Sequence, residues 1–127
     1  MEHRILLPTD FSDNSWSAIV YALKLYEDEV CTFYFLNTTA LSTSIISSIR
    51  KELSQKRVKD LAMKKLLELK DMAESSDGNS NHSFQVVLSS KDLNTAIVNA
   101  VSKYTIDLII MGTKGATITE EFLFGTN

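Results

Sequence analysis

Short apolar runs alternate with amphipathic segments along the whole chain. Such runs, when rich in β-branched and aromatic residues, are typical of strands buried on both faces of a sheet. The segments between them repeat apolar residues at i, i+3, i+4 and i+7, which indicates helices. The predicted strands are Arg4 to Leu7, Val30 to Leu36, Ser83 to Leu88 and Ile106 to Met111, and the predicted helices are Asn14 to Glu27, Arg50 to Ala73 and Leu93 to Tyr104. This order predicts a doubly wound α/β domain with a parallel sheet covered on both faces.

Composition narrows the class of protein. A chain of 127 residues fits one ordinary domain, and 44% hydrophobic with 23% charged residues excludes disorder. The net charge of −3 gives no field that would attract nucleic acid or an anionic membrane. No apolar run is long enough to span a bilayer, and the opening lacks the pattern of a signal peptide. The single Cys31 excludes an intrachain disulfide and a cysteine-cluster metal site. These features predict a reduced, cytoplasmic protein.

Two predicted strands end in loops of unusual chemistry. Pro8-Thr9-Asp10 follows the first strand, and Met111-Gly112-Thr113-Lys114-Gly115 follows the fourth. In a sheet covered on both faces the strand order must reverse, and ligands bind there, beyond the carboxyl ends of the strands. We therefore expect the first and fourth strands to be neighbours, in the order 3-2-1-4, with a ligand site between them.

Glycine is rare and concentrated. Three of the four glycines, Gly112, Gly115 and Gly125, lie in the last sixteen residues and form a Gly-x2-Gly-x9-Gly-Thr pattern that includes Thr126. Glycines let backbone N–H groups close around phosphate oxygens, and a hydroxyl adds a donor. The pattern is neither a Walker A loop nor the Gly-x-Gly-x-x-Gly dinucleotide pattern. Spacing alone leaves an alternative open, in which these glycines serve only turns and caps.

The sequence resembles the universal stress protein family, in its nucleotide-binding branch. The resemblance rests on ILLPTDFS at residues 5–12, on DLIIMGTKG at residues 107–115 and on the glycine pattern. It implies a Rossmann-like fold of the adenine nucleotide alpha hydrolase type, with five parallel strands in the order 3-2-1-4-5. It also implies ATP, or AMP or ADP, between the first and fourth strands, with Mg²⁺ arriving only with the nucleotide.

The resemblance also implies roles for single residues. It assigns the adenosine end to Pro8, Thr9, Asp10 and Thr38, the ribose to Met111 and Gly112, and the phosphates to Gly115, Gly125, Thr126 and Asn127. None of these is expected to be catalytic or to bind a resident metal. For Asp10, which directly follows a buried strand, the alternative is that its carboxylate only caps the loop.

The chain departs from the family at its carboxyl end. The family continues into a helix and a fifth strand, whereas this sequence ends at Asn127. We therefore expect residues 1–127 to form a single domain that is C-terminally incomplete, with the fifth strand missing. The fourth strand then becomes a sheet edge, which predicts self-association near Leu108 and Ile110. In the alternative, the tail from Ala116 onward folds back over this edge.

The functional prediction is an adenine-nucleotide-binding sensor or regulator of a stress response. The pattern contains no evident general base or metal-binding carboxylate pair, so binding is expected rather than rapid catalysis. The alternatives are a slow ATPase or a small-molecule transferase, and a ligand-free dimerisation module.

The basic residues of one predicted helix and the two histidines do not indicate a further functional site. Residues 50–70 hold eight of the thirteen basic residues, without interleaved aromatics, and this favours a solvated helix face over a nucleic-acid or membrane surface. His3 and His82 are expected in exposed places, with no carboxylate or serine partner evident from spacing. A hydrolytic triad is therefore not indicated.

Overall fold

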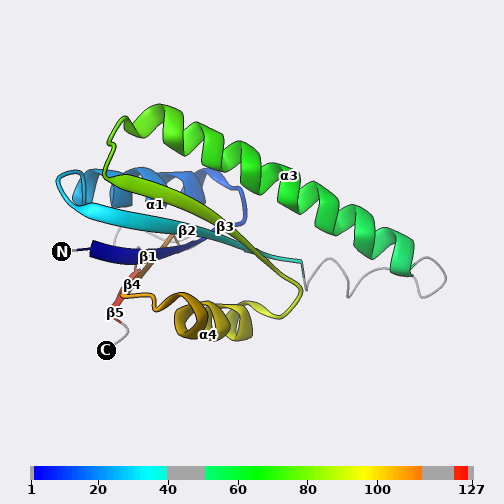
Figure 1. Ribbon diagram of the computed structural model, residues 1–127. Coiled ribbons are helices and arrows are strands. Elements are labelled where there is room, and N and C mark those ends of the chain that lie inside the picture. Colours follow the sequence, from blue (N-terminus) through cyan, green and yellow to red (C-terminus); the bar gives the residue numbers. More distant parts are fainter. Residues whose placement is uncertain (1, 40–50, 113–121, 126–127) are drawn as a thin grey trace.

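The computed structural model describes residues 2–39, 51–112 and 122–125. Its elements, in chain order, are β1 (Glu2–Pro8), α1 (Asp13–Leu25), β2 (Val30–Thr38), α3 (Lys51–Asp77), β3 (His82–Ser89), α4 (Leu93–Tyr104), β4 (Leu108–Met111) and β5 (Phe122–Gly125). The helices α1 and α3 lie on one face of the sheet and α4 lies on the other (Figure 1). The predicted α/β class and the layer arrangement are confirmed.

The sheet has the order β3-β2-β1-β4-β5. The first four strands pair in parallel, and Ile5 of β1 lies between Phe33 of β2 and Leu108 of β4. The predicted order 3-2-1-4 and the adjacency of the first and fourth strands are therefore confirmed. The carboxyl ends of β1, β2 and β4 meet at one edge of the sheet.

The fourth strand is not a sheet edge. β5 pairs with it antiparallel, and Leu108 and Ile110 lie opposite Gly125 and Leu123. The prediction that β4 is left as a sheet edge is wrong, and the alternative of a tail that folds back over this edge describes what is seen. The parallel fifth strand of the family order is not among the described strands, and self-association stays a prediction. A return by the same chain provides backbone partners for β4, and few residues separate the two strands in sequence, so bringing them together costs little entropy.

Two cores lie on opposite faces of the sheet. Alternate β1 residues point to each side, so Ile5 and Leu7 pack under α1 and α3, whereas Leu6 packs under α4. Leu66 of α3 is fully buried in the first core. Burial on both faces explains why the strands read as continuous apolar runs rather than as alternating ones.

The helix α3 extends beyond its predicted end. The sequence predicts that this helix ends at Ala73, but the helix continues to Asp77. The Ser76 hydroxyl donates to the Met72 carbonyl at 2.8 Å, so the hydroxyl is hydrogen-bonded within the helix. The helix ends where Gly78 adopts a φ of 68°, a left-handed conformation that glycine adopts without strain.

Among the described helices, none is both long enough and apolar enough to cross a membrane.

Candidate functional site

The loop after β1 is held by its own hydrogen bonds. The Thr9 N–H donates to the Leu36 carbonyl at 2.7 Å, which ties the loop to the end of β2. The Thr9 hydroxyl accepts from the Phe11 N–H at 3.0 Å. Phe11 has a φ of 66°, an uncommon conformation for a bulky residue. The loop therefore has a defined shape at the edge where the ligand site is expected.

Asp10 connects this loop to the start of α1. Its Oδ1 accepts from the Ser12 N–H at 3.0 Å and from the Ser15 hydroxyl at 2.7 Å. Ser12 is the N-cap of α1 and accepts from the Ser15 N–H at 3.2 Å. The carboxylate thus has the loop-capping role that sequence left open as the alternative. Its Oδ2 has no hydrogen-bond partner among the described residues, and Asp10 is exposed.

Two opposing effects set the charge of Asp10. Partial burial raises the pKa of its carboxyl, and hydrogen bonds from Ser12 and Ser15 lower it. The hydrogen bonds together outweigh burial, so the pKa lies below its ordinary value of 3.8. Asp10 is therefore an anion at neutral pH that can accept a hydrogen bond and is a poor general base.

A cavity of about 270 Å³ opens beside Asp10, between the loop after β1, the end of β2 and α3. It is lined by Asp10, Phe11, Asn37, Thr38, Thr39, Val58, Leu61, Ala62 and Lys65. Asp10 and Thr38 are predicted site residues, and the structure brings them to one cavity. Sequence reasoning missed the wall from α3, although Val58 and Ala62 belong to its apolar stripe. The Lys65 ammonium lies 5.6 Å from the centre of the Phe11 ring.

The polar side chains at the end of β2 support the fold as well as the cavity. The Asn37 amide donates to the Thr9 carbonyl at 2.8 Å. The Thr38 hydroxyl donates to the Lys91 carbonyl, which ties β2 to the loop before α4. A ligand near Thr38 would therefore meet its backbone more readily than its hydroxyl.

Gly112 directly follows β4 and packs against the first turn of α1. A Cβ at this position would lie 2.7 Å from the Asn14 backbone oxygen, closer than any real contact. Packing alone therefore requires glycine here, and the reading of Gly112 as a structural glycine has direct support. The same contact places Gly112 near the N-terminus of α1, where the positive end of the helix dipole favours anions.

The predicted phosphate residues are not brought together in the described part of the chain. Gly115, Thr126 and Asn127 lie outside the described residues. Gly125 ends β5 and lies opposite Leu108, which begins β4, whereas Gly112 follows the other end of β4. The physical reason is direction: an antiparallel β5 carries its carboxyl end away from the ligand edge.

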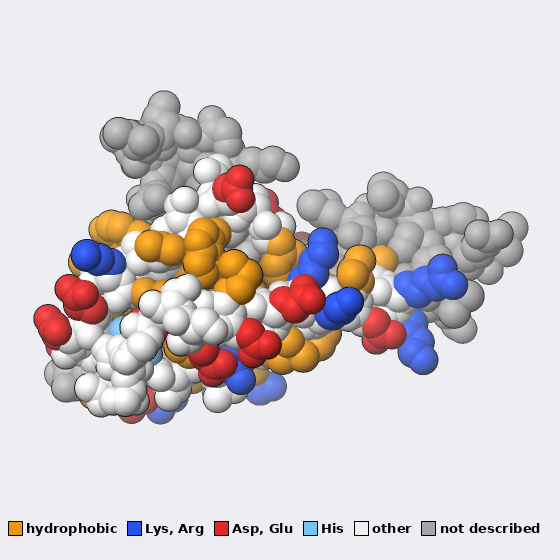
Figure 2. All heavy atoms as spheres, turned by 90° about the horizontal axis from the view of Figure 1, so that it is seen from above, with side chains coloured by type: hydrophobic (Ala, Val, Ile, Leu, Met, Phe, Trp, Pro, Cys, Tyr) orange, Lys and Arg blue, Asp and Glu red, His pale blue; other side chains and the backbone are white. Residues whose placement is uncertain are grey.

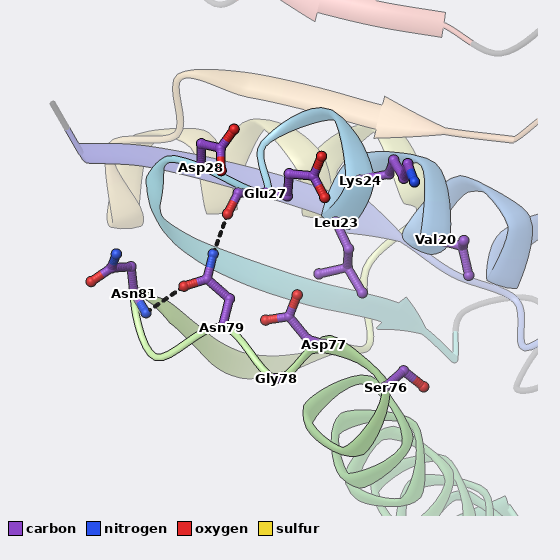
Figure 3. A pocket seen from close by; sticks show the side chains of 10 residues that line it. All are labelled: Val20, Leu23, Lys24, Glu27, Asp28, Ser76, Asp77, Gly78, Asn79 and Asn81. Atoms are coloured by element: carbon purple, nitrogen blue, oxygen red, sulfur yellow. Dashed lines mark hydrogen bonds between the residues drawn. The ribbon is translucent and has the colours of Figure 1, made fainter.

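A second cavity, of about 550 Å³, lies at the opposite end of the sheet (Figure 3). Three carboxylates border it: Glu27 and Asp28, which follow α1, and Asp77 at the end of α3. Asn79 donates to the Glu27 carbonyl and accepts from the Asn81 N–H. Within the described ranges, no group of three His, Cys, Asp or Glu residues could hold a metal ion.

His82 contacts Asp77, which borders this cavity, and its position corrects a prediction. Its side chain is fully buried, not exposed. Nδ1 lies 2.8 Å from Asp77 Oδ2, and Nε2 lies 2.9 Å from the Tyr26 carbonyl. Tyr26 comes from the end of α1 and is distant in sequence, whereas Asp77 lies five residues before His82, in a part of α3 that extends past the predicted helix end. His3 also has a carboxylate partner, with Nε2 3.2 Å from Glu29 Oε1.

Comparison with known families decides the class of the chain. The sequence profile described as the universal stress protein family matches residues 1–127. The chain belongs to the universal stress protein family. A comparison with curated proteins gives no match.

Solved structures support the fold of this family member. A universal stress protein UspA from Lactobacillus plantarum is 16% identical, with a TM-score of 0.65, and the match covers 91% of this chain and 82% of that one. The hypothetical protein MJ0577 is 14% identical, with a TM-score of 0.63, over 84% of this chain and 71% of that one. Protein Rv1636 from Mycobacterium tuberculosis H37Rv is 19% identical, with a TM-score of 0.56, over 92% and 76%. At these identities the likeness concerns the fold.

Proposed function

We propose that this universal stress protein binds an adenine nucleotide, ATP, ADP or AMP, and acts as a sensor or regulator in a stress response. The observation that carries the proposal is the cavity that unites Asp10 and Thr38 at the carboxyl ends of β1 and β2. Gly112 follows β4, the neighbour of β1, on the same edge. This is where open α/β sheets bind ligands.

The proposed roles combine the family resemblance with the positions of these residues. Pro8 and Thr9 shape the loop, Asp10 accepts a hydrogen bond through Oδ2, and the backbone of Thr38 meets the base. Met111 and Gly112 lie beside the ribose. The apolar side chains of α3 supply a surface for the base, and the mix of apolar walls with a few polar groups is typical of ligand pockets.

The proposed phosphate-binding part of the site requires a rearrangement of β5. Gly115 follows Gly112 closely in sequence, so it can reach phosphates near the start of α1. Gly125, Thr126 and Asn127 can join it only if Gly125 leaves its place opposite Leu108. We therefore propose that phosphate binding and the β4–β5 pairing compete.

Binding is favoured over catalysis. Asp10 is held ionised by Ser12 and Ser15, and the described residues of the cavity offer no histidine or second carboxylate as a general base. Mg²⁺ would enter with the nucleotide, held by its phosphates. Slow ATP hydrolysis, or transfer to a small molecule, is the alternative from the enzyme class. The cytoplasmic setting is likewise proposed.

Calorimetric titration tests the site. Asp10→Ala should weaken the binding of ATP and of adenosine by about 1–3 kcal/mol, roughly 5- to 150-fold, because a hydrogen bond to a charged acceptor is lost. Glu74→Ala, which removes an exposed carboxylate near the C-terminal end of α3, is the matched control and should leave affinity unchanged. Equal affinities in the wild type and Asp10→Ala would contradict the assignment of Asp10.

Two further measurements separate the alternatives. Nucleotide released by denaturing the purified protein supports binding, and its absence together with no titration signal supports a ligand-free module. A single-turnover assay with labelled ATP detects hydrolysis. Gly115→Val should weaken ATP more than adenosine, and ATP alone should speed amide exchange at Ile110 if the phosphates displace β5.

A further inference from the structure

The outer edge of β3 carries backbone groups with no strand partner among the described residues. β3 is the last strand on its side of the sheet. The Cys31 N–H donates to the Asn81 carbonyl at 3.1 Å, and the Thr39 N–H donates to the Ser89 carbonyl at 3.0 Å. In this parallel register the odd-numbered residues of β3 bond to β2. The N–H and C=O groups of the even-numbered residues after His82 therefore face outward, and these residues are Phe84, Val86 and Leu88.

This edge lacks the features that usually prevent association. The eight residues of β3, HSFQVVLS, include no lysine, no acidic residue and no proline. Edge strands of monomeric proteins are commonly short, charged or interrupted by proline. β5, at the other side of the sheet, is only four residues long. The edge of β3 is therefore the longer uninterrupted one.

The flank of α3 beside this edge is partly apolar. α3 packs over β2 and β3, whereas α1 packs over β1 and β4. Ser76 lines the cavity between α1 and α3. Leu67 precedes Ser76 by nine residues, which is two and a half helical turns, so it projects from the opposite side of the helix. That side faces away from α1, toward the β3 edge, and Leu67 is 46% exposed there.

The charges of α3 are divided between its two halves. Residues 56–65 contain five basic residues and one acidic residue, whereas residues 66–77 contain four acidic residues and one basic residue. In Figure 2 blue side chains gather toward the N-terminal end of α3, and red ones lie nearer its middle and C-terminal end. An antiparallel neighbour of the same sequence would place each basic half beside an acidic half.

We propose that a second copy of this chain docks on the β3 edge, antiparallel, about a two-fold axis near Val86. Phe84 would then bond to Leu88 of the partner subunit, and the two sheets would become one. The two α3 helices would lie side by side in opposite directions, with Leu67 near the axis. Lys59 would approach Glu74 of the partner subunit. Such an isologous contact is self-complementary and closes as a dimer.

Sedimentation equilibrium over a micromolar-to-millimolar series tests the dimer, together with amide exchange at low and high concentration. A monomer–dimer equilibrium is expected, with exchange at Phe84, Val86 and Leu88 slowing as concentration rises. Gln85→Lys places two ammonium groups across the axis and should raise the dissociation constant about tenfold. Gln85 is exposed, so the fold should tolerate the change. Asn94→Lys, an equal charge on exposed α4, is the control and should leave the equilibrium unchanged.

A charge swap tests the arrangement of the helices. Lys59→Glu and Glu74→Lys should each weaken the dimer, and the double variant should restore it, because both residues are exposed and neither forms an ion pair with a described residue. A strict monomer at every concentration would overturn the proposal. So would a dimer that is insensitive to Gln85→Lys and leaves exchange at Val86 unchanged, a result that would move the contact to another surface such as β5.

Discussion

Asp10 uses its two carboxylate oxygens differently. Oδ1 holds Ser12 and Ser15 and so fixes the entry into α1, while Oδ2 has no partner in the described part of the chain. The structural role and the proposed binding role therefore do not compete for the same atom. The chemistry of Asp10 could be anticipated from its place after a buried strand, but its serine partners could not be assigned from spacing alone.

The acid dependence of stability follows from this residue. Because the native pKa of Asp10 is lowered, its contribution to the free energy of unfolding is present above the unfolded value near 3.8 and is lost as pH falls through the native value. Asp10→Asn should remove that contribution, so the stability difference from the wild type should shrink in strong acid. Urea unfolding between neutral pH and acid measures this. Asp13→Asn serves as the control, and a difference that stays constant with pH would contradict the expectation.

His82 is the residue that sequence reasoning misplaced most clearly. A polar residue beside a glycine- and asparagine-rich turn reads as exposed, yet the fold brings the ends of α1 and α3 around it. Its ring also contacts Phe33 edge-on, with centroids 5.0 Å apart. The contacts with Tyr26 and Phe33 are long-range, whereas Asp77 is only five residues away and reaches the ring because α3 continues past its predicted end.

Removing this side chain should therefore be costly. His82→Ala leaves the buried Asp77 carboxylate without its partner, and we expect a loss of about 1–3 kcal/mol in the free energy of unfolding. His3→Ala is the matched control, because its contact with Glu29 is half exposed and contributes less than about 1 kcal/mol. Chemical denaturation measures the free energy of unfolding of both variants. Equal decreases in the two variants would contradict a special contribution from the buried His82.

At the scale of the elements, the spacing of apolar residues in the sequence located each predicted helix and strand. The exact ends of the helices depended on single capping residues. Ser12 and Asp92 cap α1 and α4 through their side chains, as helix-start chemistry predicts. The end of α3 was misplaced because a glycine in the left-handed region, Gly78, stops the helix later than composition suggested. Capping geometry is visible in sequence only when the capping residue is typical of its position.

The residue at the C-terminal end of α4 is unusual for its backbone conformation, and this predicts a stabilising substitution. Thr105 is the C-cap with a φ of 54°, a left-handed conformation that is unfavourable for a β-branched residue. Thr105→Gly should raise the free energy of unfolding by roughly 0.5–1 kcal/mol, because glycine adopts this conformation without strain. Ser102→Gly, on an exposed position inside α4, should instead lower it by a similar amount. Thermal unfolding of both variants tests the opposite signs.

At the scale of the whole molecule, strand order could be predicted because alternation, crossover handedness and the two polar loops all favoured one topology. The direction of the last strand could not. The apolar residues Phe122 to Phe124 suggested a strand or a cover, and the order of the family suggested parallel pairing. Only residues 112–121 separate β4 from β5, which is fewer than the dozen or more that a parallel crossover needs. An antiparallel return can still supply hydrogen-bond partners to the outer backbone groups of β4.

This pairing predicts how truncation acts. The Asp107 N–H donates to the Arg4 carbonyl at 2.8 Å, so odd-numbered residues of β4 face β1, and Leu108 and Ile110 turn their amides toward β5. A chain of residues 1–121 should lose amide protection at Leu108 and Ile110 and should self-associate through the exposed edge. A chain of residues 1–125, which keeps β5, is the control and should behave like the intact protein. Placing Gln85→Lys in both truncated chains disables the proposed β3 contact, so remaining association reports on β4. If residues 1–121 stay monomeric with Ile110 protected, the edge must be covered by something other than β5.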